Sequence, residues 1–105
     1  MNYKTFKKRK QKVLGKNYTL YIADTPAKRQ KGLSGIKEIP NNHGMIFCYP
    51  DLKIRNFTMK KTHCKLKILF FDENFNCIKL TTGKPNSNKL ISSEKPAMYV
   101  IEIPY

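Results

Sequence analysis

Strand-length apolar segments separated by turn residues constrain the fold of this chain more than any other feature. In residues 65–71 the side chains alternate, with Leu66, Ile68 and Phe70 on one face. Turn residues follow at Asp72-Glu73-Asn74, after which the chain returns in another apolar segment. This pattern predicts a β-hairpin with a connection of about three to four residues.

A single helix signal interrupts the strands. Thr25 is a suitable N-cap, Pro26 fits the first helical position and Gly32 is a natural stop, so we expect a helix of about two turns. Pro50 is expected to end the apolar run before it. Further strands are expected at residues 13–23, 45–49, 53–59 and 97–103, with a long loop at 81–96.

Short strands with turns between them predict a mainly β fold. We expect an antiparallel β-sandwich, jelly-roll-like, with one short α-helix after the first strand. The 105 residues, 40% of them hydrophobic, suffice for one core. We divide the chain into a basic N-terminal arm or strand, residues 1–12, and a single β domain, residues 13–105.

Charge is the second strong feature. The chain has 21 basic and 7 acidic residues, a net charge of +14, and residues 1–31 contain ten of the basic residues and one acid. Like charges at this density destabilise a compact protein, and a negatively charged partner offsets that cost. The alternative is a solvated lysine-rich surface. Lysines outnumber arginines eighteen to three, which favours contact without sequence readout.

Two basic segments are the candidate sites for nucleic acid or another anionic partner. Aromatic residues interleave with them and could stack on bases, or could belong to the core. These aromatics are Tyr3, Phe6, Tyr18, Tyr21 and Phe57. The candidate binding residues are Lys4, Lys7, Lys8, Arg9, Lys10, Lys12, Lys53, Arg55, Lys60, Lys61, Lys65 and Lys67.

Metal binding and catalysis find little support in the sequence. Structural zinc sites usually have ligands paired two to four residues apart, and adjacent His63 and Cys64 would point to opposite faces of a strand. The pair could instead form a nucleophile and base, but no oxyanion element accompanies it. We therefore expect no metal, no cofactor and no catalytic residue. The metal-ligand candidates weighed are His43, Cys48, His63, Cys64 and Cys77.

Six segments, in the same order along the chain, resemble the landmarks of the DUF192 domain family. The resemblance covers about residues 20–105 and implies a compact β-sandwich with a short helix after the first strand. It implies a fold and no mechanism. The segments are Ile22-Ala23-Asp24-Thr25-Pro26, Lys31-Gly32-Leu33, Gly44-Met45-Ile46-Phe47, Phe57-Thr58-Met59-Lys60-Lys61-Thr62, Leu66-Lys67-Ile68-Leu69-Phe70-Phe71-Asp72 and Lys95-Pro96-Ala97-Met98-Tyr99-Val100-Ile101-Glu102-Ile103-Pro104.

The chain departs from that family's pattern at four positions. Members of the family usually read Phe-Trp-Met-Lys-Asn-Thr followed by Pro-Leu-Asp. Here Thr58 stands at the Trp position, and Lys61, Lys65 and Lys67 stand at the Asn, Pro and Asp positions. A lysine cannot replace an Asn or Asp as a metal ligand or as the same general base. The comparison implies that a polar site formed by those residues is lost here.

The function we expect is that of a small, strongly basic, non-catalytic β-sandwich protein. It would be a structural or interaction component of a larger assembly, a phage virion or a nucleoprotein particle, contacting a nucleic acid backbone or acidic protein surfaces. The alternative is a small-anion-binding or enzymatic domain with a pocket around Met59, Lys61, Thr62 and Lys67.

Location and membrane contact can be addressed from the same residues. The basic start is followed by too short an apolar run for a signal peptide, and no run is long enough to span a membrane. We expect a location in the cytoplasm or within a virus particle, no secretion through a signal peptide, and no membrane partner.

Overall fold

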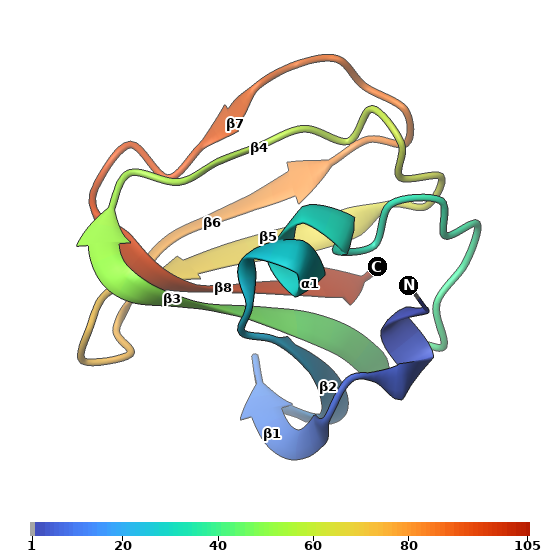
Figure 1. The fold of residues 1–105 in the computed structure, drawn as a ribbon, viewed down its shortest axis with the longest axis horizontal. Coiled ribbons are helices and arrows are strands. Elements are labelled where there is room, and N and C mark those ends of the chain that lie inside the picture. Colours follow the sequence, from blue (N-terminus) through green and yellow to red (C-terminus); the bar gives the residue numbers. More distant parts are fainter. Residues whose placement is uncertain (1) are drawn as a thin grey trace.

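The main sheet of this protein has six strands in the order β1-β2-β3-β8-β5-β6, and a second sheet pairs β4 with β7 (Figure 1). The computed structural model describes residues 2–105. In chain order the elements are the 3-10 helix η1 (Tyr3–Thr5), β1 (Lys8–Val13), β2 (Lys16–Ala23), α1 (Pro26–Lys31), β3 (His43–Lys53), β4 (Asn56–Phe57), β5 (Leu66–Phe71), β6 (Cys77–Gly83), β7 (Ile91–Ser92) and β8 (Ala97–Pro104).

The predicted mainly β class with one short α-helix is confirmed. The structure differs in two respects. The helix α1 follows the second strand, since residues 8–13 form a strand of their own, and β2 and β3 pair parallel while the other strand pairs are antiparallel. The chain leaves β2 through α1 and the loop at 32–42, then re-enters the sheet beside β2 in the same direction. A crossover of this kind is what a parallel pair requires.

The predicted hairpin and helix are both present. β5 and β6 pair antiparallel across the turn at residues 72–76. At the start of α1 the Thr25 hydroxyl accepts a hydrogen bond from the Lys28 amide at 3.2 Å. At its end Gly32 has φ +45°, and a Cβ there would lie 3.2 Å from the Phe47 ring. Glycine is therefore favoured at this position by both backbone conformation and packing.

Four strand boundaries differ from the prediction. Of the strand expected at 53–59, only the last residue of β3 and the two residues of β4 are extended. The strand expected at 13–23 is broken by a tight turn at Leu14 and Gly15, with φ of 50° and 81°, so residues 8–13 form β1 of a hairpin. β3 continues past Pro50, and a register shift between Cys48 and Lys53 in its pairing with β8 accommodates the proline. The loop expected at 81–96 contains the end of β6 and all of β7.

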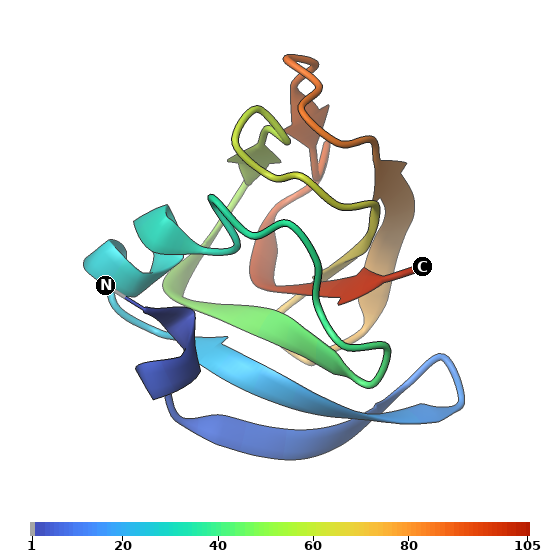
Figure 2. The same ribbon diagram turned by 90° about the vertical axis from the view of Figure 1, so that its right-hand side faces the viewer.

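Apolar side chains pack on both faces of the main sheet. The first cluster includes Phe47, Ile68 and Phe70, together with Tyr3 and Phe6 from the N-terminal segment. Figure 2 shows η1 and α1 on the same side of β2 and β3. The opposite face carries a second cluster drawn mainly from β2, β5 and β8. Within residues 2–105, no helix has the length and apolar character needed to cross a membrane.

Candidate functional site

Strand β1 presents a row of lysines at the edge of the main sheet. Lys8, Lys10 and Lys12, hereafter the lysine row, are all exposed, and as alternate residues of one strand they lie on one face. Their positions repeat about every 6.7 Å along the strand. β1 pairs only with β2 among the described strands, so the row borders an open edge.

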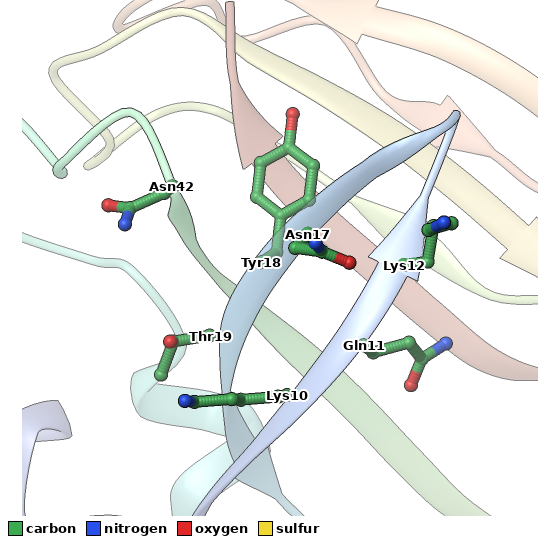
Figure 3. A pocket seen from close by; sticks show the side chains of 7 residues that line it. All are labelled: Lys10, Gln11, Lys12, Asn17, Tyr18, Thr19 and Asn42. Atoms are coloured by element: carbon green, nitrogen blue, oxygen red, sulfur yellow. The ribbon is translucent and has the colours of Figure 1, made fainter.

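A groove of about 500 Å³ runs beside the lysine row (Figure 3). In this view the Lys10 side chain extends across β2 and lies beside Thr19. Hydroxyl and amide groups can donate to phosphate oxygens alongside the ammonium groups, so the lining suits an anion with several oxygens. The residues that line the groove are Lys10, Gln11, Lys12, Asn17, Tyr18, Thr19 and Asn42.

The positive charge of the lysine row is not neutralised within residues 2–105. The four salt bridges found there all involve other cations. Asp24, the first acid along the chain, pairs with Lys28 at 3.6 Å. A group of exposed ammonium charges without carboxylate partners attracts an anionic polymer.

The N-terminal segment that carries these lysines is held to the core by aromatic side chains. Tyr3 is 5% exposed and Phe6 is 3% exposed. The Tyr3 ring packs edge-on against Tyr21, with a centroid distance of 4.9 Å. Lys4 and Lys7 point to solvent beside these anchors. Of the two alternatives for the first twelve residues, the structure has a short 3-10 helix followed by a strand.

Base stacking by the interleaved aromatics is not available in this fold. Tyr3, Phe6, Tyr18 and Tyr21 are buried in the two apolar clusters. Phe57 packs edge-on against Phe47 with a centroid distance of 5.2 Å. The aromatic rings belong to the core, so charge is what the N-terminal surface offers a partner.

Arg55 of the second basic segment is used by the fold itself. Its side chain is 11% exposed and forms a salt bridge of 2.8 Å with Asp51. Its Nε donates to the Ala97 carbonyl at 2.9 Å, and the guanidinium lies 3.8 Å from the centroid of the Tyr49 ring. Lys53 also pairs with Asp51, at 3.1 Å. We leave Arg55 out of the proposed binding surface because its donors are engaged.

The other lysines of the second segment lie away from the lysine row. Lys60 and Lys61 are exposed in the turn after β4. Lys65 and Lys67 lie beside Tyr105, with Nζ 5.8 and 5.9 Å from the ring centroid. Strands β2, β3 and β8 separate β1 from β5, and Figures 1 and 2 both place β1 and the turn after β4 at opposite ends of the molecule. The two basic segments do not form one surface.

Cysteine and histidine residues do not assemble a reactive centre among residues 2–105. No group of three or more metal-ligating side chains is found there. Burial raises the pKa of the Cys48 and Cys64 thiols, which disfavours the nucleophilic thiolate. His63 lies 2.7 Å from the Asn86 side chain, and Cys77 is exposed.

The alternative pocket around Met59, Lys61, Thr62 and Lys67 is not assembled as one site. Met59 is buried beneath Gly83 and Lys61 points to solvent. Thr62 lines a small cavity. The side chain of Lys67 lies on the face of β5 that points away from that cavity.

Sequence reasoning missed the residue that shares the cavity with Thr62, the buried Glu102. A signal for it was present, because Glu102 is the single charged residue in the apolar run that forms β8.

Two solved structures are similar to this fold. A candidate transcription regulator from Sinorhizobium meliloti 1021 superposes with a TM-score of 0.80 and 27% identity, covering 85% of this chain and 70% of that one. A protein of unknown function from Novosphingobium aromaticivorans DSM 12444 superposes with a TM-score of 0.78 and 20% identity, covering 97% and 84%. The second likeness shows the fold alone. No curated protein matches the chain.

The landmarks that resembled one domain family are matched by that family over nearly the whole chain. The match extends over residues 6–105, from the buried Phe6 to the C-terminal tyrosine, and the family's description is "Uncharacterized ACR". This protein belongs to the DUF192 family.

Proposed function

We propose that this protein is a non-catalytic binding module that docks on the phosphate backbone of a nucleic acid through β1. The observation that carries the proposal is the lysine row, three exposed lysines on an edge strand without a carboxylate partner among residues 2–105. Release of counterions from the nucleic acid would then supply most of the affinity.

The side chains available on this surface favour contact without sequence readout. Lysine is a point charge and lacks the planar fork with which arginine reads guanine. Arg9 is the single arginine of β1, and alternation puts it on the opposite face from the lysine row. The neighbouring aromatics are buried, so they cannot read bases by stacking.

The charge of the whole molecule supports the same proposal. With a net charge of +14, the positive side chains of the protein repel one another, and docking on a polyanion offsets that repulsion. The proposal includes a role as a component of a larger assembly, a phage virion or a nucleoprotein particle. In such a particle the phosphates of the nucleic acid would surround the protein with negative charge.

A competing explanation for the lysine row is protection of the sheet edge. Lysines on an edge strand discourage pairing with a second chain and so reduce aggregation. The two explanations differ in what is lost when the lysines are replaced. Protection predicts aggregation of the variant, whereas docking predicts a soluble variant that no longer binds.

The test compares two triple variants with the same loss of charge. One removes the lysine row, Lys8→Gln, Lys10→Gln and Lys12→Gln, and the control changes Lys60, Lys61 and Lys65 to Gln. Affinity for duplex DNA is measured by fluorescence anisotropy across a salt series. The slope of log affinity against log salt should become shallower by roughly 0.9 for each lost phosphate contact in the first variant, and should change little in the control.

Three results would count against the proposal. Equal slopes for the two variants would place the contact elsewhere, and affinity that does not depend on salt would exclude phosphate contact. Equally tight binding of polyglutamate would assign the surface to acidic proteins instead.

A further inference from the structure

A glutamate lies in the apolar face of the main sheet. Glu102 belongs to β8, with Met45 of β3 opposite on one side and Ile68 of β5 on the other. It is 5% exposed, and its neighbours in the face are the residues of the first apolar cluster. Acids are almost never buried to this extent unless they are paired.

Glu102 has no protein partner among residues 2–105. It takes part in none of the salt bridges there, and burial is the single cause acting on its carboxyl, whose pKa rises to about 7. No side-chain oxygen or nitrogen in that part of the chain is both fully enclosed and without a hydrogen bond. The carboxylate oxygens therefore face open space and not packed atoms.

That open space is a cavity of about 90 Å³ beneath the C-terminal end of α1. A single water occupies roughly 10–15 Å³ on this kind of measure, so the cavity holds a few heavy atoms. In Figure 1, α1 lies over β3 and β8, the strands that contribute Phe47 and Glu102 to the lining of the cavity. Its walls are formed by Arg29, Gln30, Lys31, Gly32, Leu33, Ser34, Phe47, Phe57, Thr58, Thr62 and Glu102.

The cations that border the cavity are already engaged elsewhere. Arg29 donates to the Cys48 carbonyl at 2.9 Å and its guanidinium lies 4.9 Å from the centroid of the Tyr49 ring. The Lys31 ammonium donates to the Ser34 carbonyl. What the cavity offers a ligand is therefore a carboxylate and hydroxyl groups, beside the rings of Phe47 and Phe57, which pack edge-on against each other.

We propose that this cavity binds a small primary ammonium ion, with Glu102 and Thr62 as its acceptors. An ammonium group carries three N–H donors, and aromatic faces attract cations. Calcium takes six to eight oxygen ligands, and this lining has a single carboxylate. The cavity of about 90 Å³ holds only a few heavy atoms, which favours a small free amine over the long lysine side chain of a partner protein.

Binding should follow the ionisation of Glu102. The other titratable groups that face it are Tyr49 from β3 and Cys64 from the segment before β5, and burial raises the pKa of each, so both stay neutral below pH 8. The basic residues that border the cavity are Arg29 and Lys31 of α1. His43 lies on the same face of β3, 3.4 Å from the Tyr21 hydroxyl.

The test is a titration of the full chain with methylammonium, followed by amide NMR shifts of Gly32, Thr58 and Thr62. Saturable shifts are expected at pH 8. Glu102→Gln should weaken binding by about tenfold or more, as should lowering the pH to 5, because the acceptor charge is lost. Glu94→Gln, the same change on an exposed loop, should bind like the wild type.

Further measurements distinguish loss of binding from misfolding, and a free amine from a lysine side chain. Thr62→Val should weaken binding severalfold without touching the carboxylate, and His43→Gln should leave the pH profile unchanged. Nα-acetyl-lysine amide should bind more weakly than methylammonium. The proposal would be overturned if wild type and Glu102→Gln bound methylammonium with equal affinity, or if sodium at the same concentration caused equal shifts. Tighter binding of the lysine derivative would overturn the assignment of the ligand to a free amine.

Discussion

Strands β1 and β8 belong to the same sheet, but the charged side chains of β1 are exposed and the one charged side chain of β8 is buried. β1 is an edge strand whose lysine row faces solvent, so its charges keep their hydration. β8 is central, and Glu102 on it is 5% exposed between two neighbouring strands. The exposure of a charge in this fold is governed by the position of its strand in the sheet. Side chains on the edge strand reach bulk water, whereas Glu102 on the central strand reaches only a cavity of about 90 Å³.

The two regions also differ in how solution conditions reach them. Exposed lysines interact through water, where salt screens them over about a Debye length. Glu102 lies where little water penetrates, and burial alone raises its pKa to about 7. Salt should therefore control what β1 binds, and pH should control what the Glu102 cavity binds.

Of the substitutions that test the difference between β1 and β8, Phe6→Ala should have the largest effect on stability. Phe6 is 3% exposed and holds the segment before β1 to the core, so its truncation should cost about 3–5 kcal/mol in the free energy of unfolding. Lys7→Ala, the exposed neighbour, should stay within about 0.5 kcal/mol of the wild type. Urea denaturation measures both. A loss below about 1 kcal/mol for Phe6→Ala would mean that β1 does not depend on this anchor.

A smaller effect is expected from Glu102→Gln, and it should depend on pH. The pKa of Glu102 is raised in the folded protein, to about 7 from 4.5. Between these values the folded state binds a proton that the unfolded state lacks, so wild-type stability falls as pH rises towards 7. Gln cannot ionise. Relative to the variant, the wild type should lose about 3 kcal/mol between acidic pH and pH 8.

The measurement for this prediction is a set of urea titrations of wild type and Glu102→Gln across that pH range. Any constant cost of burying the amide shifts the difference between the two curves by the same amount at every pH, so the change of that difference with pH reports the ionisation of Glu102. Parallel curves would show that Glu102 is solvated in the folded state. Adding methylammonium at pH 8 should stabilise the wild type and leave the variant unchanged.

The smallest effect on stability is expected from the triple variant of the lysine row. These side chains are exposed and have no carboxylate partner among residues 2–105, so each replacement by Gln should change the free energy of unfolding by no more than about 0.5 kcal/mol. The expected sign is stabilising, because self-repulsion is reduced. Thermal denaturation and light scattering measure stability and aggregation together. Aggregation of the folded variant would support edge protection instead of docking.

Local signals predicted the elements that depend on neighbouring residues. The Thr25 cap, Pro26 and the Gly32 stop predicted α1, and alternation predicted the β5–β6 hairpin. The β1–β2 turn was missed because Leu14 adopts φ 50°, a conformation that nothing in its side chain indicates. Of the candidate site, exposure of the lysine row followed from its charge, but the engagement of Arg55 with Asp51 did not.

Residue types and their spacing were enough to predict the mainly β class, the family, the single helix and the excess of positive charge, because each of these depends on the order of residues along the chain. Three features became visible in the folded protein: β2 and β3 run parallel, the two basic segments lie apart, and Glu102 faces a cavity under α1. These three depend on which strands become neighbours. Which strands pair is set by packing between residues far apart in the chain, so a local sequence pattern does not predict it.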